Sequence, residues 1–212
     1  MSNRRRFFGS LFAGALAAPT WRSLAASAPP VSEEWDLRWV NRLRGEHKQV
    51  FDIGGVADGQ LRVVKNWLNG HNEVFKLRDN QLVAVVGLAG KGFPANASDA
   101  LWEKYPIGER WQVRDPATDS WAKRNVFANA APGTPAHANS VPALVSRGVI
   151  FWQCNNALRG IAGELATAAG HNAESVYQEL RAGLLPHVEL VPAHTMLVGL
   201  CQEVGCTYEA IV

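Results

Sequence analysis

The amino-acid sequence predicts a single α/β domain whose mostly parallel sheet is covered by helices on both faces. Short apolar runs alternate with longer amphipathic segments along residues 48–212. The apolar runs are continuous, as in LVAVVGL at 82–88, which is typical of strands buried on both faces. The 184 residues after position 28 are enough for one domain with a sizeable core.

The first part of this region is an amino-terminal arm, residues 29–47. Trp35, Trp39 and Leu43 recur there at helical spacing, so we expect a short docking helix. The core domain then opens with an apolar strand at 48–53, which two glycines stop.

A helix and a second strand follow. Residues 60–68 place their apolar side chains on one helical face. The buried strand at 82–88 ends in a glycine-rich turn, and residues 94–105 are expected to be helical, with Ser98 or Asp99 near the start.

Residues 106–138 lose all periodicity and carry four prolines between aromatic and basic side chains. A loop this long inside a compact domain is usually functional, or it is an arm that binds another subunit. Regular structure then resumes. The remaining expected elements are helix 140–146, strand 148–153, helices 157–169 and 173–182, strand 188–191, helix 194–204 and strand 207–212.

The amino terminus has the order of a secretory signal, with basic residues, a short apolar stretch and then small residues. Segment 2–8, SNRRRFF, places adjacent arginines before two phenylalanines and resembles the twin-arginine export motif. We therefore expect residues 1–28 to direct export to the periplasm. Cleavage after Ala28, cleavage after Ala25 and retention as an anchor all remain open, and the alternative is a basic cytoplasmic tail.

The charge of the chain belongs largely to this signal. Residues 1–28 contain four of the 21 basic residues and none of the 19 acidic ones, so the net charge changes from +2 to −2 when they are removed. A mildly acidic domain gives no reason to expect a nucleic-acid partner.

Three cysteines remain, and their odd number suits either one disulfide with a free thiol or three free thiols. Ligands of parallel sheets bind at the carboxyl ends of the strands. Cys154 follows the strand at 148–153 and belongs to that edge, where the start of the next helix favours a thiolate. Cys201 and Cys206 precede the last strand and belong to the opposite edge, where they could form a structural disulfide.

Other candidates share the edge of Cys154. His194 begins a helix after one strand and Lys91 follows another, so both are expected to stabilise the thiolate. Asn155, Asn156 and Arg159 come directly after the cysteine and are the expected ligand-binding residues.

The sequence predicts no metal site and no cofactor. It contains no His-x-x-x-His or Cys-x-x-Cys spacing. The glycines of 87–92 are misplaced for a phosphate loop, and no Ser or Thr follows Lys91.

Segment 144–161, LVSRGVIFWQCNNALRGI, joins a helix end, a Gly-Val pair, an apolar strand and a cysteine. It resembles the DsrE/DsrF-like superfamily, and the tail at 190–211 fits the closing helix and strand of that family. The match extends more loosely to 50–53 and 82–87. The insertion at 106–138 and the helical segment at 157–185 are larger than the minimal family pattern.

This resemblance implies a small Rossmann-like domain that commonly assembles as trimers or hexamers. It also implies sulfur handling, with a persulfide on the cysteine that matches Cys154. The leading hypothesis is therefore an exported protein of sulfur or redox metabolism, with a sulfur-carrying small molecule or protein as partner.

Two hypotheses of other classes compete with it. One is a non-catalytic binding or assembly subunit, which would use the 111–127 arm and the helix at 33–43 as interfaces. The other is a ligand or haem carrier.

Overall fold

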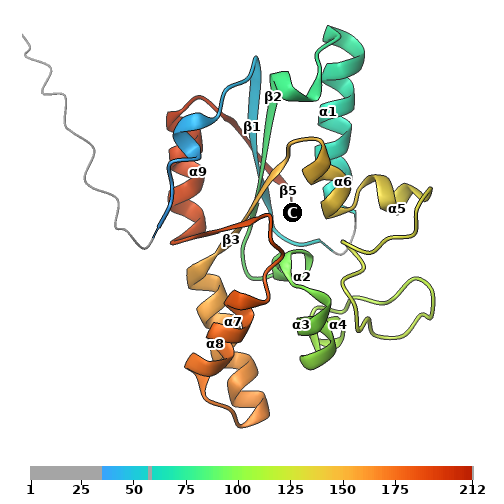
Figure 1. Ribbon diagram of the computed structural model, residues 1–212, viewed down its shortest axis with the longest axis vertical. Coiled ribbons are helices and arrows are strands. Elements are labelled where there is room, and N and C mark those ends of the chain that lie inside the picture. The colour runs from blue at the N-terminus through green and yellow to red at the C-terminus, as the bar shows by residue number, and fades with distance from the viewer. Residues whose placement is uncertain (1–34, 57–58, 212) are drawn as a thin grey trace, which may run out of the picture. The chain divides into compact units, whose positions relative to one another are not determined.

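The computed structural model describes residues 35–56 and 59–211. The expected signal at 1–28 and residues 29–34 of the arm lie outside the described residues. The rest forms an α/β domain around a five-stranded sheet in the order β4-β3-β2-β1-β5, with each neighbouring pair parallel (Figure 1). The strands are β1 (His47–Ile53), β2 (Leu82–Leu88), β3 (Ile150–Cys154), β4 (Val188–Val191) and β5 (Thr207–Ile211). The predicted fold class is confirmed, and the arrangement is Rossmann-like.

Helices cover both faces of this sheet. The α-helices are α1 (Leu61–Phe75), α2 (Phe93–Asn96), α3 (Asp99–Lys104), α4 (Ile107–Arg110), α5 (Pro135–Ala138), α6 (Val141–Ser146), α7 (Asn155–Ala169), α8 (Ala173–Ala182) and α9 (His194–Glu203). Two 3-10 turns, η1 (Val40–Arg42) and η2 (Asp79–Gln81), precede β1 and β2. Helices α1 and α6 pack on one face and share a core with it, whereas α9 and η1 pack on the other (Figure 1). No helix in the described part of the chain is long and apolar enough to cross a bilayer.

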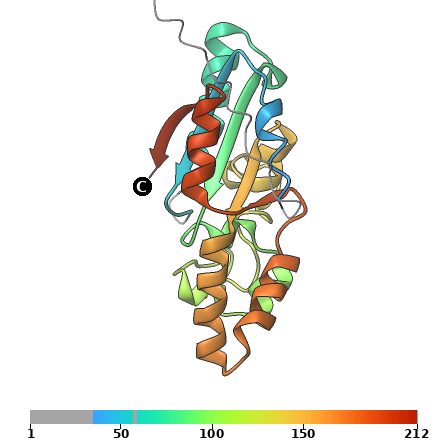
Figure 2. The same ribbon diagram turned by 90° about the vertical axis from the view of Figure 1, so that its left-hand side faces the viewer.

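A further group of helices extends past the carboxyl ends of the strands. Figures 1 and 2 both show the α7–α8 hairpin in this position, with α2, α3 and α4 near it. These helices have their own core, in which Trp102 and Tyr177 are the largest buried side chains. The carboxyl edge of the sheet is therefore enclosed by protein on several sides.

The prediction of a docking helix is wrong within the described part of the arm. Only η1 is helical there, because Trp39 and Leu43 are buried against the sheet beside α9 and Leu43 adopts an extended backbone. The indole of Trp39 lies 6.4 Å from that of Trp152, measured between ring centroids. Burial on its own domain takes this face of the arm out of contact with partners.

The helix expected at 94–105 is divided in two. Helix α2 ends because Ala97 is extended and forms an isolated antiparallel bridge with Leu184. Ser98 is also extended and is the N-cap of α3. A tertiary pairing with the segment before β4 therefore interrupts a locally helical sequence.

The loop expected at 106–138 contains the single-turn helices α4 and α5 at its two ends and folds back on the domain. The buried Asn125 holds it, since its side-chain amide donates to the carbonyls of Ala95 and Ala97 at 3.1 and 2.7 Å. Gly108 allows the backbone of Ala122 to approach so closely that a Cβ atom would lie 2.2 Å from the Ala122 oxygen.

Candidate functional site

Cys154 lies where two helices begin. It is the last residue of β3 and the N-cap residue of α7. The backbone N–H of His194, the first residue of α9, donates to the Cys154 Sγ at 3.3 Å. The sulfur therefore lies at the positive end of the α9 dipole, whereas the Cys154 side chain makes no capping hydrogen bond to α7. The side chain is buried, with 6% of the residue exposed.

The imidazole of His194 is occupied by other partners. The indole N–H of Trp152 donates to Nδ1 at 3.1 Å, and Nε2 lies 2.8 Å from the Asp52 carboxylate. An indole is a donor only, so Nδ1 must supply a lone pair and Nε2 carries the proton that is donated to Asp52. The ring is therefore fixed at both nitrogens, and only the backbone of His194 contacts the thiol.

Asp52 connects this arrangement to the edge of the sheet. Its second carboxylate oxygen accepts a hydrogen bond from the Tyr208 hydroxyl at 2.9 Å. That hydrogen bond raises the pKa of Tyr208 above its usual value. Trp152, His194, Asp52 and Tyr208 thus form a continuous hydrogen-bonded network across β3, α9, β1 and β5, which we call the His194 network.

A glycine in a buried strand makes room for this network. A Cβ atom on Gly87 of β2 would lie 2.4 Å from the ring of Trp152 and 2.8 Å from Cε1 of His194. The two rings meet edge to face, with centroids 5.5 Å apart. Such a glycine marks a close approach of neighbouring groups, and here it belongs to β2 rather than to the turn that follows.

A cavity of about 370 Å³ opens beside the network. Its lining residues come from β1, β5 and α9: Asp52, His194, Thr195, Val198, Gln202 and Tyr208. The Asp52 side chain is 31% exposed and that of His194 is 12% exposed. Asp52, Trp152 and Tyr208 were not predicted from the sequence as site residues. Asp52 could have been, because it is an acidic residue near the carboxyl end of an apolar strand, where ligands of parallel sheets bind.

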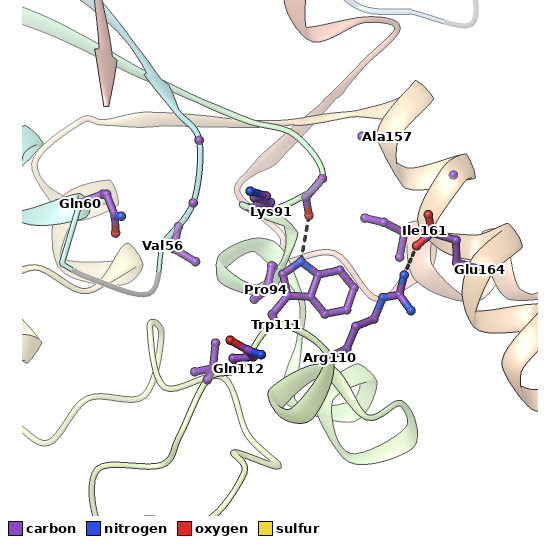
Figure 3. Close-up of a pocket in the computed structure, with 15 residues that line it drawn as sticks. Val56, Gln60, Lys91, Pro94, Arg110, Trp111, Gln112, Ala157, Ile161 and Glu164 are labelled. Carbon is purple, nitrogen blue, oxygen red and sulfur yellow. Dashed lines mark hydrogen bonds and ion pairs between the residues drawn. The ribbon is translucent and has the colours of Figure 1, made fainter. Parts of the chain in front are cut away.

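Lys91 lies in a different cavity. This second space, of about 1030 Å³, is also at the carboxyl edge and is drawn in Figure 3. Its lining shares no residue with the cavity beside His194. The structure therefore brings Cys154 and His194 together but places Lys91 with Arg110, Trp111 and Glu164 instead.

Two of the three expected ligand-binding residues hold α7 against α8. The buried Asn155 accepts a hydrogen bond from the Tyr177 hydroxyl at 2.8 Å. The Arg159 guanidinium lies 3.9 Å from the centroid of the Tyr177 ring and pairs with Glu174 at 3.2 Å. Asn156, in the first turn of α7, is exposed.

Cys201 and Cys206 lie toward the amino edge of the sheet. Both are buried free thiols joined by a hydrogen bond. That hydrogen bond and burial together raise the pKa of the Cys201 thiol. The Cys206 backbone N–H also donates to the Cys201 carbonyl at 2.9 Å, so a short turn holds the two residues together.

No group of three His, Cys, Asp or Glu side chains within residues 35–56 and 59–211 is placed to hold a metal ion. No family model matches the chain, and no curated protein matches it either. Among solved structures, the chain is similar to the protein of unknown function MTH1491 from Methanobacterium thermoautotrophicum. The two share 17% identity with a TM-score of 0.37, and the match covers 78% of this chain and 100% of the other.

Proposed function

We propose that this chain is an exported, DsrE-like protein of sulfur or redox metabolism in which Cys154 accepts sulfur as a persulfide. The observation that supports this most strongly is the position of the sulfur, 3.3 Å from the first backbone nitrogen of α9, on a residue that directly precedes the first turn of α7. Helix N-termini and backbone N–H groups favour anions, and the thiolate is the nucleophilic form of cysteine.

The chemical step is an exchange without net oxidation or reduction. The Cys154 thiolate attacks the terminal sulfur of a donor R–S–SH, where R is a sulfur chain or a small organic group. A bond forms between Sγ and that sulfur as the bond between the two donor sulfurs breaks, and R–S⁻ leaves with the electron pair. Cys154 then carries –S–SH, and attack by an acceptor thiolate on its outer sulfur returns the Cys154 thiolate.

The His194 network has a positioning role in this proposal. Because Trp152 and Asp52 fix both ring nitrogens, His194 does not act as a proton acceptor for the thiol. Fixing the ring also fixes the first turn of α9, so its N–H stays directed at the sulfur. With only 6% of Cys154 exposed, a compact donor is favoured over a folded protein.

The competing hypotheses have less support. Asn125 and Gly108 hold the 111–127 arm against its own domain, which leaves it poorly suited to a free interface. A haem ligand needs an unoccupied imidazole nitrogen, whereas both nitrogens of His194 have partners. The family resemblance also leads us to propose a homo-oligomer, a trimer or hexamer, which light scattering of the purified chain would measure.

Mass spectrometry tests the sulfur-acceptor function directly. The purified, reduced chain is incubated with inorganic polysulfide and digested, and the peptides carrying the three cysteines are compared. We expect one added sulfur atom on the Cys154 peptide and none on the peptide that carries Cys201 and Cys206, because those two buried thiols are hydrogen-bonded to each other. The Cys154→Ser variant should lose that adduct while keeping its melting temperature.

Alkylation of the native chain by iodoacetamide serves as the accessibility control. A Cys154 thiol that alkylates but takes up no sulfur contradicts the proposal. A thiol that does neither contradicts it as well, since it would be an inert core cysteine.

A further inference from the structure

The larger cavity at the carboxyl edge has the features of a ligand site that is separate from Cys154. It lies between the loops that follow β1 and β2 and the helices α4 and α7 (Figure 3). Its volume of about 1030 Å³ is at the upper end of the range for small-molecule sites. Gly54, Gly55, Gly90 and Gly160 line it, so backbone rather than bulky side chains borders much of the space.

Trp111 supplies a fixed aromatic surface in this cavity. Its indole N–H donates to the carbonyl of Gly90 at 3.1 Å, as the dashed line in Figure 3 shows. The Arg110 guanidinium lies 5.2 Å from the ring centroid, and the buried Phe93 ring is 5.7 Å away. An indole held in one orientation is a good stacking surface for a flat ring, because little entropy is lost on binding.

Among the charged side chains that line the cavity, one cation has no ion-pair partner within the described residues. Arg110 of α4 forms an ion pair with Glu164 of α7, so these two charges cancel across one wall. Lys91 is exposed and has no hydrogen-bond or ion-pair partner within the described residues. The cavity therefore combines an apolar stacking surface with an unpaired cation.

We propose that this cavity binds a flat aromatic metabolite that carries a negative group. The ring stacks on Trp111 and the anion pairs with Lys91. A nucleoside monophosphate and an aromatic carboxylate share this chemistry. The proposal does not depend on sulfur transfer, since Cys154 does not line this cavity.

Calorimetric titration with AMP and with indole-3-acetate tests the site and separates the two sources. We expect saturable binding of at least one probe with a dissociation constant below about 1 mM, and the tighter probe identifies the class of anion. The Lys91→Gln variant should bind that probe about tenfold more weakly, because one charge-assisted contact is lost. The Glu164→Gln variant should bind it a few-fold more tightly, because Arg110 is then released to the anion.

Two control variants show whether a change in affinity comes from the cavity itself or from the loss of any exposed lysine or tryptophan. Lys76→Gln removes an exposed lysine at the end of α1, and Trp121→Leu removes an exposed tryptophan under Arg114. Both should leave the affinity unchanged, whereas Trp111→Leu should weaken it about tenfold. Failure of both probes to saturate, or equal affinity of the wild-type and Lys91→Gln chains, would overturn the proposal.

Discussion

The two edges of the sheet use their polar side chains differently. At the amino edge, Arg147 donates four hydrogen bonds of 2.8–3.0 Å to Asp79, Asn69 and Asn72. These bonds join η2, α1 and the end of α6, so the polar side chains at this edge have partners within the fold. At the carboxyl edge, Lys91 and Asp52 instead face cavities. The amino edge thus pairs its polar side chains with one another. At the carboxyl edge, Asp52 is paired with His194 and Tyr208, but Lys91 has no partner within the described residues.

The cysteines show the same contrast. Toward the amino edge, Cys201 and Cys206 are free thiols that are hydrogen-bonded to each other and buried in the core beside α9. At the carboxyl edge, the Cys154 sulfur accepts a hydrogen bond from the first backbone N–H of α9. Cysteine therefore fills space in the core at one edge and contacts the start of a helix at the other.

The largest expected effect comes from filling the space that Gly87 leaves at the carboxyl edge. In the Gly87→Ala variant, the new methyl group meets the rings of Trp152 and His194, which cannot both stay in place. We expect the free energy of unfolding to fall by about 3 kcal/mol, as for other overpacked cores. Urea unfolding followed by tryptophan fluorescence measures this loss. Alkylation of Cys154 should change too, because the start of α9 must move.

Gly199→Ala is the matched control for this substitution. Gly199 lies within α9, and a Cβ atom there would meet nothing within 4 Å. Replacing a helical glycine by alanine should therefore stabilise the chain slightly, by about 0.5–1 kcal/mol. Equal losses in the two variants would show that the close packing at Gly87 is not what holds the His194 network.

The sequence predicts which edge of the sheet a residue occupies better than it predicts which face. Continuous apolar runs locate β2 and β4 to the residue, and the order of strands and helices puts Cys154, His194 and Lys91 at the carboxyl edge. Which of these side chains meet depends on which face each helix crosses, and that is a tertiary property. Lys91 and His194 therefore share an edge but line different cavities.

The missed residues have a similar explanation. Asp52 and His194 are 142 positions apart. Their hydrogen bond forms only because α9 packs on the sheet over the neighbouring strands β1 and β5. Local periodicity also fails where a distant segment intervenes, as at Ala97, where the bridge to Leu184 divides the expected helix.

Breaking the amino edge should have the next largest effect, and it should leave the thiol unchanged. The Arg147→Met variant removes the cation that Asp79 faces, and both side chains are partly buried, with 22% and 32% exposed. We expect a loss of about 2 kcal/mol, which is less than for a fully buried pair. Urea unfolding measures the loss, and Arg62→Met on α1 is the exposed control. A change in the alkylation rate of Cys154 would contradict the separation of the two edges.

The smallest expected effect is a pH dependence of the Arg147 contribution. Hydrogen bonds from Arg147 hold the pKa of Asp79 below its usual value of 3.8, against a smaller opposing effect of burial. Because the folded-state pKa is lowered, the carboxylate stabilises the fold fully above 3.8, and this contribution is lost as the pH falls through the folded value. The difference in unfolding free energy between the wild-type and Arg147→Met chains should therefore stay constant from pH 7 to about pH 5 and shrink by about 1 kcal/mol in stronger acid. Urea titrations of both chains across this range measure it. A difference that stays constant down to pH 2, or grows there, would mean that Asp79 is not the partner through which Arg147 stabilises the amino edge.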